Sequence, residues 1–383
     1  MDKSFPFPLN YYDYLKKRCD TLFPYVEKEL AHLKEKGMAG PFHHVEEYAI
    51  HADAYLKSET QAFINHSYGT LVERYGERRA QEMGPELLRS KEVEQAFHSF
   101  EMNYTTALNF ELFGKKTFYV TPNLYEHLAQ TSIDTDCELA RLPFPSCMFV
   151  YDSPQAIDLL YQTADDTPVT YDGAISVFAS ELQENNERKI LLYVFHADMN
   201  RYHYAVRRQL LLRETWTLEQ ALRTDWLKVN PESEKGAPFA VSDELFYTAG
   251  LGFFRSIVNT ILYLGSNDPD LVQQLSPYRQ LEERLSKAKS REKRKDIKSE
   301  MKRTSRLDYI LVGRNIPRLM PENTGTSTGT EQREMHVRFV VRGHWRNQPY
   351  GPGNSLRRPV WIKPYYKGPE ISDLIKNRPY IIS

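Results

Sequence analysis

Several features that define common protein classes are scarce or missing in this sequence of 383 residues. Its three cysteines, Cys19, Cys137 and Cys147, are too few and too scattered for a disulfide framework or a zinc site. No apolar run approaches the roughly 18–20 residues of a membrane span. The mixed polar residues at 1–20 do not resemble a signal peptide. We therefore expect a cytoplasmic protein with reduced cysteines and no membrane association.

Motifs that would indicate a cofactor or a metal are also missing. The chain has no glycine-rich phosphate loop of the Walker or dinucleotide type, no Gly-x-Ser-x-Gly elbow and no Cys/His metal spacing. His44, Glu47 and His51 would share one face of a helix, but they lack the tighter His-Glu-x-x-His spacing. The sequence therefore predicts no metal site and no cofactor.

Charge is distributed unevenly, although the net charge is only −1. Residues 284–383 contain 23 lysines and arginines against 9 aspartates and glutamates, whereas residues 1–283 contain 27 against 42. Segregation of this size is typical of a polyanion-binding segment attached to an acidic body. The alternative is that the two oppositely charged parts attract each other.

The pattern of apolar residues predicts an α+β fold. Residues 1–110 form an N-terminal helical region with helices at 10–40, 45–74 and 78–110, the last with a soft break at Gly84-Pro85. Residues 111–275 form an α+β core domain, a central mixed sheet with flanking helices, with strands at 116–120, within 139–151, at 174–180 and at 189–197. Within it, a helix at 216–227 is capped by Thr217, and an apolar central helix at 242–264 holds Asn259 as a satisfied buried amide. Residues 276–383 form a basic helix and a C-terminal β-hairpin, with a further strand at 308–312.

The segment 271–306 is highly charged and reads as one exposed basic helix. Lys293 and Arg294 lie near its middle and are candidate contacts to phosphates. A merely solvated helix surface would explain the same composition.

Residues 336–346 alternate between two faces, as in a half-buried strand. Val337, Phe339, Val341 and Trp345 form the apolar back, and the front carries His336, Arg338, Arg342, His344 and Arg346. Residues 347–354 read as a turn, and the strand returns through 357–365 with Trp361, Lys363 and Tyr365 on the front. A cationic face with aromatics suits a nucleic acid. The candidate nucleic-acid-binding residues of the hairpin are Arg338, Arg346, Arg357, Arg358, Trp361, Lys363 and Tyr365. The alternative is a basic solvated face.

The same face contains the candidate catalytic residues, His344 and Arg342. A metal-independent ribonuclease needs a general base near neutral pH and cations that stabilise the phosphate, and histidine and arginine supply these roles. His336 and His344 would lie about 26 Å apart along a strand. Each would therefore need a partner from elsewhere, such as Tyr350, His196 or His203.

The block Arg342-Gly343-His344-Trp345-Arg346, followed by Trp361-Ile362 and Pro364-Tyr365, resembles the C-terminal signature of a widespread group of uncharacterised bacterial and phage proteins. Two further runs, at 142–146 and 258–264, are similar to patterns in that group. The resemblance implies a bacterial or phage source and no particular mechanism.

Three functions follow from these observations. The first is a nucleic-acid-binding protein, for RNA or DNA, that serves as a toxin or phage-defence component. The second is a metal-independent ribonuclease toxin on the same face. The third is an interaction protein whose basic segment docks on an acidic partner or on its own acidic body. A protein partner or an antitoxin is a further candidate partner. The sequence leaves the oligomeric state open.

Overall fold

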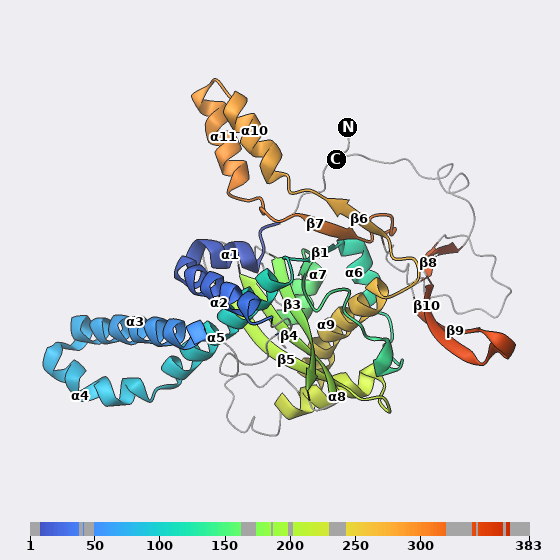
Figure 1. Ribbon diagram of the computed structural model, residues 1–383, viewed down its shortest axis with the longest axis horizontal. Helices are drawn as coiled ribbons and strands as arrows, with labels where there is room; N and C mark the ends of the chain where they lie inside the picture. The colour runs from blue at the N-terminus through green and yellow to red at the C-terminus, as the bar shows by residue number, and fades with distance from the viewer. Residues whose placement is uncertain are drawn as a thin grey trace, which may run out of the picture.

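The computed structural model describes residues 8–37, 41, 50–161, 174–184, 187–197, 202–229, 243–318, 339–341, 344–362 and 365–367. Its centre is a seven-stranded mixed sheet in the order β5-β4-β3-β2-β1-β7-β6 (Figure 1). The strands are β1 (Thr117–Val120), β2 (Ser146–Tyr151), β3 (Ala174–Glu184), β4 (Glu187–Ala197), β5 (Tyr202–Leu212), β6 (Leu271–Gln274) and β7 (Tyr309–Val312). β1 runs parallel to both neighbours, β2 and β7, and the remaining pairs are antiparallel. The predicted α+β class is confirmed.

Helices cover both faces of the sheet, so its interior strands are buried on both sides. In β2, Phe149 and Tyr151 pack into one apolar cluster while Met148 and Val150 pack into the other. α6 (Pro122–Ala129), α7 (Pro154–Tyr161), α8 (Leu218–Val229) and α9 (Asp243–Leu264) contribute to the first cluster. α1 (Tyr11–Arg18), α2 (Phe23–Glu35) and α5 (Lys91–Leu112) contribute to the second. Strands buried on two faces read as continuous apolar runs, which is the pattern that β2 and β4 show.

One part of the N-terminal helical region extends away from the sheet (Figure 1). α3 (Ile50–Tyr75) and α4 (Glu77–Leu88) lead outward, and α5 returns to the body. The predicted break at Gly84-Pro85 is wrong, because α4 continues through both residues. The chain breaks instead at Arg89-Ser90, where the Ser90 hydroxyl accepts a hydrogen bond from the Val93 N–H (3.4 Å) and begins α5.

Two predicted details of the core are confirmed. Thr217 caps α8, since its hydroxyl accepts from the N–H of Gln220 (3.3 Å) while the Gln220 side chain accepts from the N–H of Thr217 (2.9 Å). Asn259 on α9 is fully buried, and its amide group donates to the carbonyl oxygens of Leu128 (2.9 Å) and Thr131 (2.8 Å) at the end of α6.

The segment between β6 and β7 forms two helices, not the single helix expected over 271–306. α10 (Tyr278–Lys287) and α11 (Arg291–Met301) form a helical hairpin that projects from the edge of the sheet (Figure 1). The single-helix prediction is wrong because residues 271–274 pair with β7 as strand β6 and because Ser290 caps a new helix, accepting from the N–H of Lys293 at 3.2 Å. Below, "the arm" means residues 277–304.

The predicted C-terminal hairpin is present as two antiparallel pairs. β9 (His344–Tyr350) pairs with β10 (Leu356–Ile362), and β8 (Phe339–Val341) pairs with β11 (Tyr365–Lys367). The turn is shorter than predicted, because residues 347–350 continue the ladder of β9 and only 351–355 connect the strands. Below, "the ribbon" means β9, β10 and their connection, residues 344–362. Among the described helices, none is both long and apolar enough to span a membrane.

Candidate nucleic-acid interface

A buried network of hydrogen bonds fixes both ends of the arm to the body. Ser276 precedes α10 and Ser305 follows α11, and these two residues are 1% and 0% exposed. The Ser276 hydroxyl donates to the Ser305 carbonyl oxygen (2.6 Å), and the side-chain amide of Asn10 donates to the Ser305 hydroxyl (3.0 Å). The Asp308 carboxylate accepts from the N–H of Ser276 (2.8 Å). Because buried polar groups are costly to leave unpaired, this network holds the root of the arm in one arrangement.

Further contacts hold the two helices of the arm together. Leu281 of α10 and Ile297 of α11 are buried apolar side chains of the arm. Arg284 crosses to Glu300 as an ion pair at 3.1 Å. At the tip, the Arg294 guanidinium donates to the carbonyl oxygens of Leu285 (3.3 Å) and Ala288 (3.4 Å), which end α10. Arg294, predicted as a phosphate contact, therefore has a structural role in the arm.

A line of four cations runs along α11. Arg291, Lys295, Lys298 and Lys302 recur at i, i+4, i+7 and i+11, which places them within about 60° of one another around the helix axis. All four are exposed. They extend over roughly 16 Å of axis, at a rise of about 1.5 Å per residue. Below, they are called the cationic stripe. By the same spacing, the predicted contact Lys293 is exposed on the other side of the helix, with Glu300.

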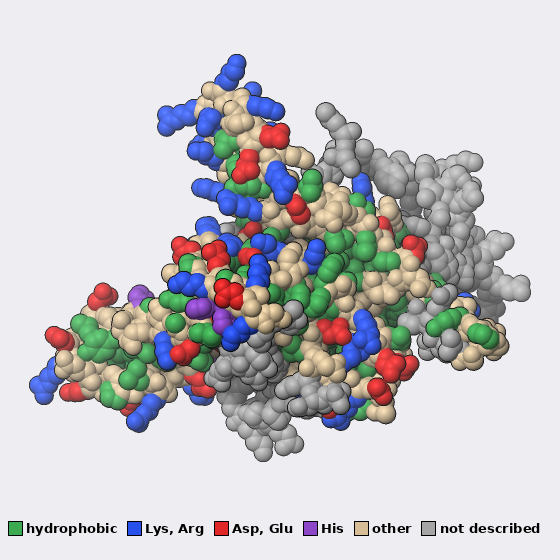
Figure 2. Space-filling model, in the orientation of Figure 1, with side chains coloured by type: hydrophobic (Ala, Val, Ile, Leu, Met, Phe, Trp, Pro, Cys, Tyr) green, Lys and Arg blue, Asp and Glu red, His purple; other side chains and the backbone are tan. Residues whose placement is uncertain are grey.

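No acidic residue in the described part of the body neutralises the stripe. The arm projects away from the body, and blue side chains dominate its surface in Figure 2. The ion pairs of the arm are local: Arg284–Glu300, Lys287–Glu283 (3.9 Å) and, at the root, Arg279–Asp308 (3.4 Å). No ion pair joins a stripe residue to any part of the chain that the structure describes. These observations give no support to the alternative in which the basic segment docks on its own body.

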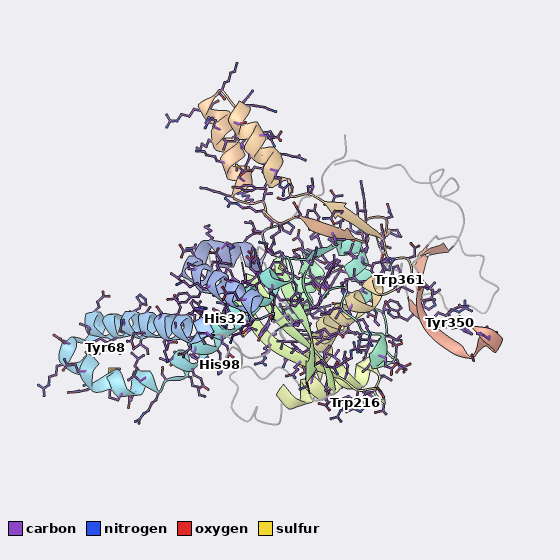
Figure 3. All side chains as sticks on the ribbon, viewed as in Figure 1. His32, Tyr68, His98, Trp216, Tyr350 and Trp361 are labelled. Carbon is purple, nitrogen blue, oxygen red and sulfur yellow. The ribbon has the colours of Figure 1, made fainter. Side chains whose placement is uncertain are left out.

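The ribbon is anchored to the body through its two tryptophans. Trp345 and Trp361 face each other across the strands, so they lie on the same face of the ribbon. The Trp345 indole N–H donates to Asn259 Oδ1 (2.8 Å). Trp361 is 7% exposed and packs edge-on against Tyr263, with ring centroids 4.7 Å apart. Figure 3 shows Trp361 on the body side of the ribbon and Tyr350 farther out.

This register corrects the predicted face of Trp361. The sequence placed Trp361 on the cationic front, but the pairing puts it on the back with Trp345, directed toward α9. The prediction failed because the alternation of faces within each strand does not say which residue of the second strand lies opposite which residue of the first. A shift of one residue in this pairing moves every side chain of the second strand to the opposite face. In this arrangement the Trp361 ring is a packing group and is not available for stacking on a base.

The front of the ribbon keeps part of its predicted charge. His344 and Arg346 are exposed, as expected. Arg357 and Arg358 lie in β10 and Tyr365 in β11, but their side chains are outside the described part of the chain, as are residues Arg338, Arg342 and Lys363. The structure therefore places two of the predicted cationic front residues on the exposed face and leaves the others as predictions.

The described residues bring no acid–base partner to His344. It makes no hydrogen bond or ion pair with any side chain that the structure describes. Its three suggested partners do not meet it: His196 is fully buried in β4, Tyr350 is six residues along the same strand at roughly 20 Å, and the side chain of His203 is outside the described residues. The geometry thus offers no described catalytic pair for the ribonuclease alternative.

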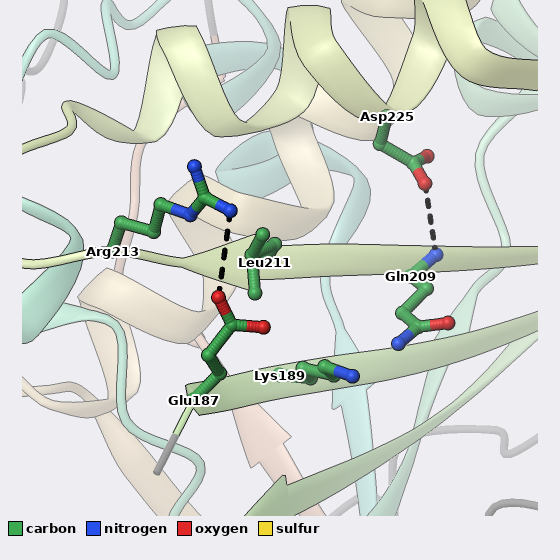
Figure 4. A pocket seen from close by; sticks show the side chains of 6 residues that line it. All are labelled: Glu187, Lys189, Gln209, Leu211, Arg213 and Asp225. Atoms are coloured by element: carbon green, nitrogen blue, oxygen red, sulfur yellow. Dashed lines mark hydrogen bonds and ion pairs between the residues drawn. The ribbon is translucent and has the colours of Figure 1, made fainter. Parts of the chain in front are cut away.

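Two other places with ionisable side chains were candidates for a site. A hollow of about 260 Å³ lies at the β5 edge of the sheet (Figure 4) and is lined by Glu187, Lys189, Gln209, Leu211, Arg213 and Asp225. Its two acidic and two basic residues balance, and Arg213 pairs with Glu187 at 3.4 Å, so the hollow offers no surplus charge for an anion. Among the described residues, no group of three His, Cys, Asp or Glu side chains is placed to hold a metal ion. His43, His44, Glu46 and Glu47 lie outside the described residues.

One titratable group lies beside the root of the arm. Burial raises the pKa of the Asp13 carboxyl to about 6, against the opposing effects of hydrogen bonds to Ser305, Asn10 and Arg306 and of the charge of Arg306. Asp13 is part of the capping box of α1, accepting from the N–H of Asn10 (3.3 Å). Its protonation therefore acts on the same network that fixes the arm.

Sequence reasoning did not identify the cationic stripe. Lys293 and Arg294 were predicted from charge density alone. Both residues are adjacent to stripe residues in the sequence, but neither belongs to the stripe. The i, i+4, i+7, i+11 spacing of Arg291, Lys295, Lys298 and Lys302 is present in the sequence and would have separated one face of α11 from the other.

Comparison with known proteins identifies a relationship for most of the chain. A family model described as "AcrVA2-like: Anti-CRISPR type V subtype A2 family" matches residues 118–366. A solved structure described as "Crystal structure of AcrVA2" is similar with 12% sequence identity and a TM-score of 0.39, over 92% of this chain and 96% of that chain. No curated protein matches the chain.

Proposed function

The chain belongs to the AcrVA2-like family, the anti-CRISPR type V subtype A2 family, and from this premise we propose that it counters a type V CRISPR defence by binding nucleic acid through the arm. Membership in the family supports the phage and defence context of the protein. The nucleic acid as partner, RNA or DNA, is our proposal.

The observation that carries the proposal is the unneutralised cationic stripe on a firmly rooted, projecting helix. Four exposed cations in one line, with no acidic partner among the described residues, form a surface that a polyanion complements. The exposed His344 and Arg346 on the ribbon would add to it, together with Arg338, Arg357, Arg358, Lys363 and Tyr365. Trp361 contributes by holding the ribbon in place.

Excision of the arm tests the proposal. Ser276 and Ser305 are joined by a hydrogen bond of 2.6 Å, so a short Gly-Ser turn replacing residues 277–304 can reconnect β6 and β7 without disturbing the sheet. We expect the intact protein to bind nucleic acid with an affinity that falls by roughly 0.7–0.9 log units per log unit of salt for each phosphate contacted. The excised variant should lose most of this salt-dependent affinity at an unchanged melting temperature.

The same variant tests the biological role. In cells whose type V CRISPR system targets a plasmid, expression of the intact protein should raise the number of transformants. The excised variant should not. Equal protection by a folded variant without the arm would contradict the proposal and would favour an inhibitor that acts through a protein partner bound elsewhere.

A ribonuclease on the ribbon is the second candidate, favoured only by the exposure of His344 beside Arg346 and by its neighbour Arg342. Cleavage of RNA in the presence of EDTA, abolished in a folded His344→Ala variant, would establish it. Binding without turnover would leave the nucleic-acid-binding function alone.

A further inference from the structure

We propose that the arm binds double-helical nucleic acid along one phosphate backbone and discriminates against single strands. This inference rests on the proposed function and names the class of ligand for it. Three features of the arm point to a duplex: the lack of aromatic side chains beyond its root, the regular spacing of its cations and the fixed position of its root.

Beyond its root, the arm has no aromatic side chain on which a base could stack. Its one aromatic residue, Tyr278, lies at the first position of α10, where the Arg306 guanidinium covers its ring at 4.6 Å. From Arg279 to Arg306 the sequence contains no Trp, Tyr, Phe or His. Proteins that bind single strands combine cations with aromatic side chains, and each stacked base contributes about 1–3 kcal/mol. The tryptophans of the ribbon do not fill this gap, since Trp345 donates to Asn259 and Trp361 is buried against Tyr263. A flexible strand would therefore gain only electrostatic attraction from the arm.

The spacing of the stripe suits a regular row of phosphates. Its successive cations, from Arg291 to Lys302, are separated by roughly 6, 4.5 and 6 Å along the helix axis. They fill a narrow sector of the helix surface, so they face one line of charges. A duplex presents such a line in a fixed geometry, whereas a single strand must first be ordered to match it, which lowers its affinity.

The root of the arm makes this row rigid before any ligand binds. Ser276, Ser305 and Asn10 form the buried network described above, and Arg294 closes the tip on α10. The helix backbone therefore loses little conformational freedom on binding a rigid ligand, and only the exposed side chains of the stripe have to be ordered.

The stripe also implies that binding is independent of base sequence. Its three lysines and one arginine face a line of phosphates, and contacts to phosphates carry no sequence information. The helix α11 also contains no Asn or Gln, the residues that read adenine in the major groove. Duplex DNA and duplex RNA share the chemistry that the stripe recognises, a regular row of phosphates held in place along each backbone of the double helix. Which of the two is bound is decided by experiment.

The test uses the full chain and four fluorescent probes of one sequence: a 20-base-pair DNA duplex, the RNA duplex, and one strand of each. Anisotropy titrations run from 50 to 200 mM salt. We expect at least one duplex to bind about tenfold or more tightly than either single strand, and a probe with scrambled sequence to bind equally well.

A pair of charge-matched variants locates the binding surface. The stripe variant Lys295→Gln/Lys298→Gln removes two exposed cations that have no acidic partner among the described residues. The control Lys57→Gln/Lys287→Gln removes two exposed lysines that already pair with Asp53 (2.6 Å) and Glu283 (3.9 Å). The stripe variant should lower the salt slope for the duplex by about 1.8, or 0.9 for each phosphate that is no longer neutralised, while the control keeps the slope. Both variants should melt at the temperature of the unchanged protein.

The outcomes separate this inference from the function on which it rests. Equal or tighter binding of the single strands, with the slope still reduced in the stripe variant, would overturn duplex selectivity and keep nucleic-acid binding by the arm. An equal reduction of the slope in the stripe and control variants would overturn the stripe as the binding surface. No binding of any probe at 50 mM salt would overturn the proposed function itself.

Discussion

The arm and the ribbon are both basic segments of the C-terminal third, yet they relate to the body in opposite ways. The arm contacts the body at its root, and its stripe cations point into solvent. The ribbon contacts the body through its aromatics, with Trp345 bonded to Asn259 and Trp361 packed on Tyr263. An aromatic side chain among cations can therefore pack against its own protein and hold a segment in place. The exposed cations of the stripe make no such contact with the described part of the body, so they remain accessible to a ligand.

The largest effect is expected from removing the side chain that anchors the ribbon to the body. Trp361→Ala should lower the free energy of unfolding by about 3–5 kcal/mol, because it deletes a buried ring and leaves a cavity against Tyr263. Urea unfolding measures the change, and the exposed Arg346→Ala serves as the control, with an expected change within about 0.5 kcal/mol. Equal stability of the two variants would show that Trp361 does not anchor the ribbon.

A slightly smaller effect is expected from the amide that joins the ribbon to the core. Asn259→Ala should cost about 3 kcal/mol, since it removes two buried hydrogen bonds, to the carbonyl oxygens of Leu128 and Thr131, and the acceptor of the Trp345 indole N–H. Asn123→Ala, which removes one part-buried bond to the Ile316 carbonyl oxygen, is the control and should cost about 1 kcal/mol. A change at Asn259 no larger than at Asn123 would contradict the role of this amide.

The root of the arm can be probed through pH. Because burial raises the pKa of Asp13 from 3.8 to about 6, the folded state holds a proton that the unfolded state has released between these values. The contribution of Asp13 to stability therefore falls as pH rises from about 4 to 6. Asp13→Asn does not titrate, so the melting temperature of the variant minus that of the unchanged protein should rise across this window. A constant difference would mean that Asp13 titrates normally.

The smallest loss of stability is expected from a substitution at the tip of the arm. Arg294→Ala should destabilise the hairpin by about 0.5–1 kcal/mol through loss of its bonds to the carbonyl oxygens that end α10. Faster amide hydrogen exchange at 285–294 is the readout. Arg294→Lys keeps the charge and loses the forked donor, so faster exchange with unchanged nucleic-acid binding in this variant would confirm a structural role.

Much of the fold followed from local patterns. The buried strands β2 and β4 contain runs of apolar residues, and the helix α9 is apolar on most of its surface, so local pattern and tertiary structure agree there. Thr217 and Asn259 form the cap and the buried amide that their chemistry predicts. β6 was missed because its four residues are half exposed at the sheet edge and are followed by helical sequence. Their strand conformation comes from pairing with β7, far along the chain.

The candidate site was only partly predictable, for the same physical reason. Charge density identified the right segment at 284–303, but the exposed face depends on where α11 begins, and that is set by Ser290. The face of Trp361 depends on strand register, which no single strand contains. The resemblance through the Arg342–Arg346 block remains a prediction, since the family match does not address that motif.

The position of β7 has a consequence for the order in which the molecule can form. β7 lies between β1 and β6 and runs parallel to β1, although the two strands are far apart in the sequence. Until that distant strand arrives, β1 has an open edge whose backbone N–H and C=O groups lack partners on one side. Closing such a long loop costs chain entropy, which slows the pairing of β7 with β1. We therefore expect the protein to be most prone to aggregation before β7 has inserted between β1 and β6.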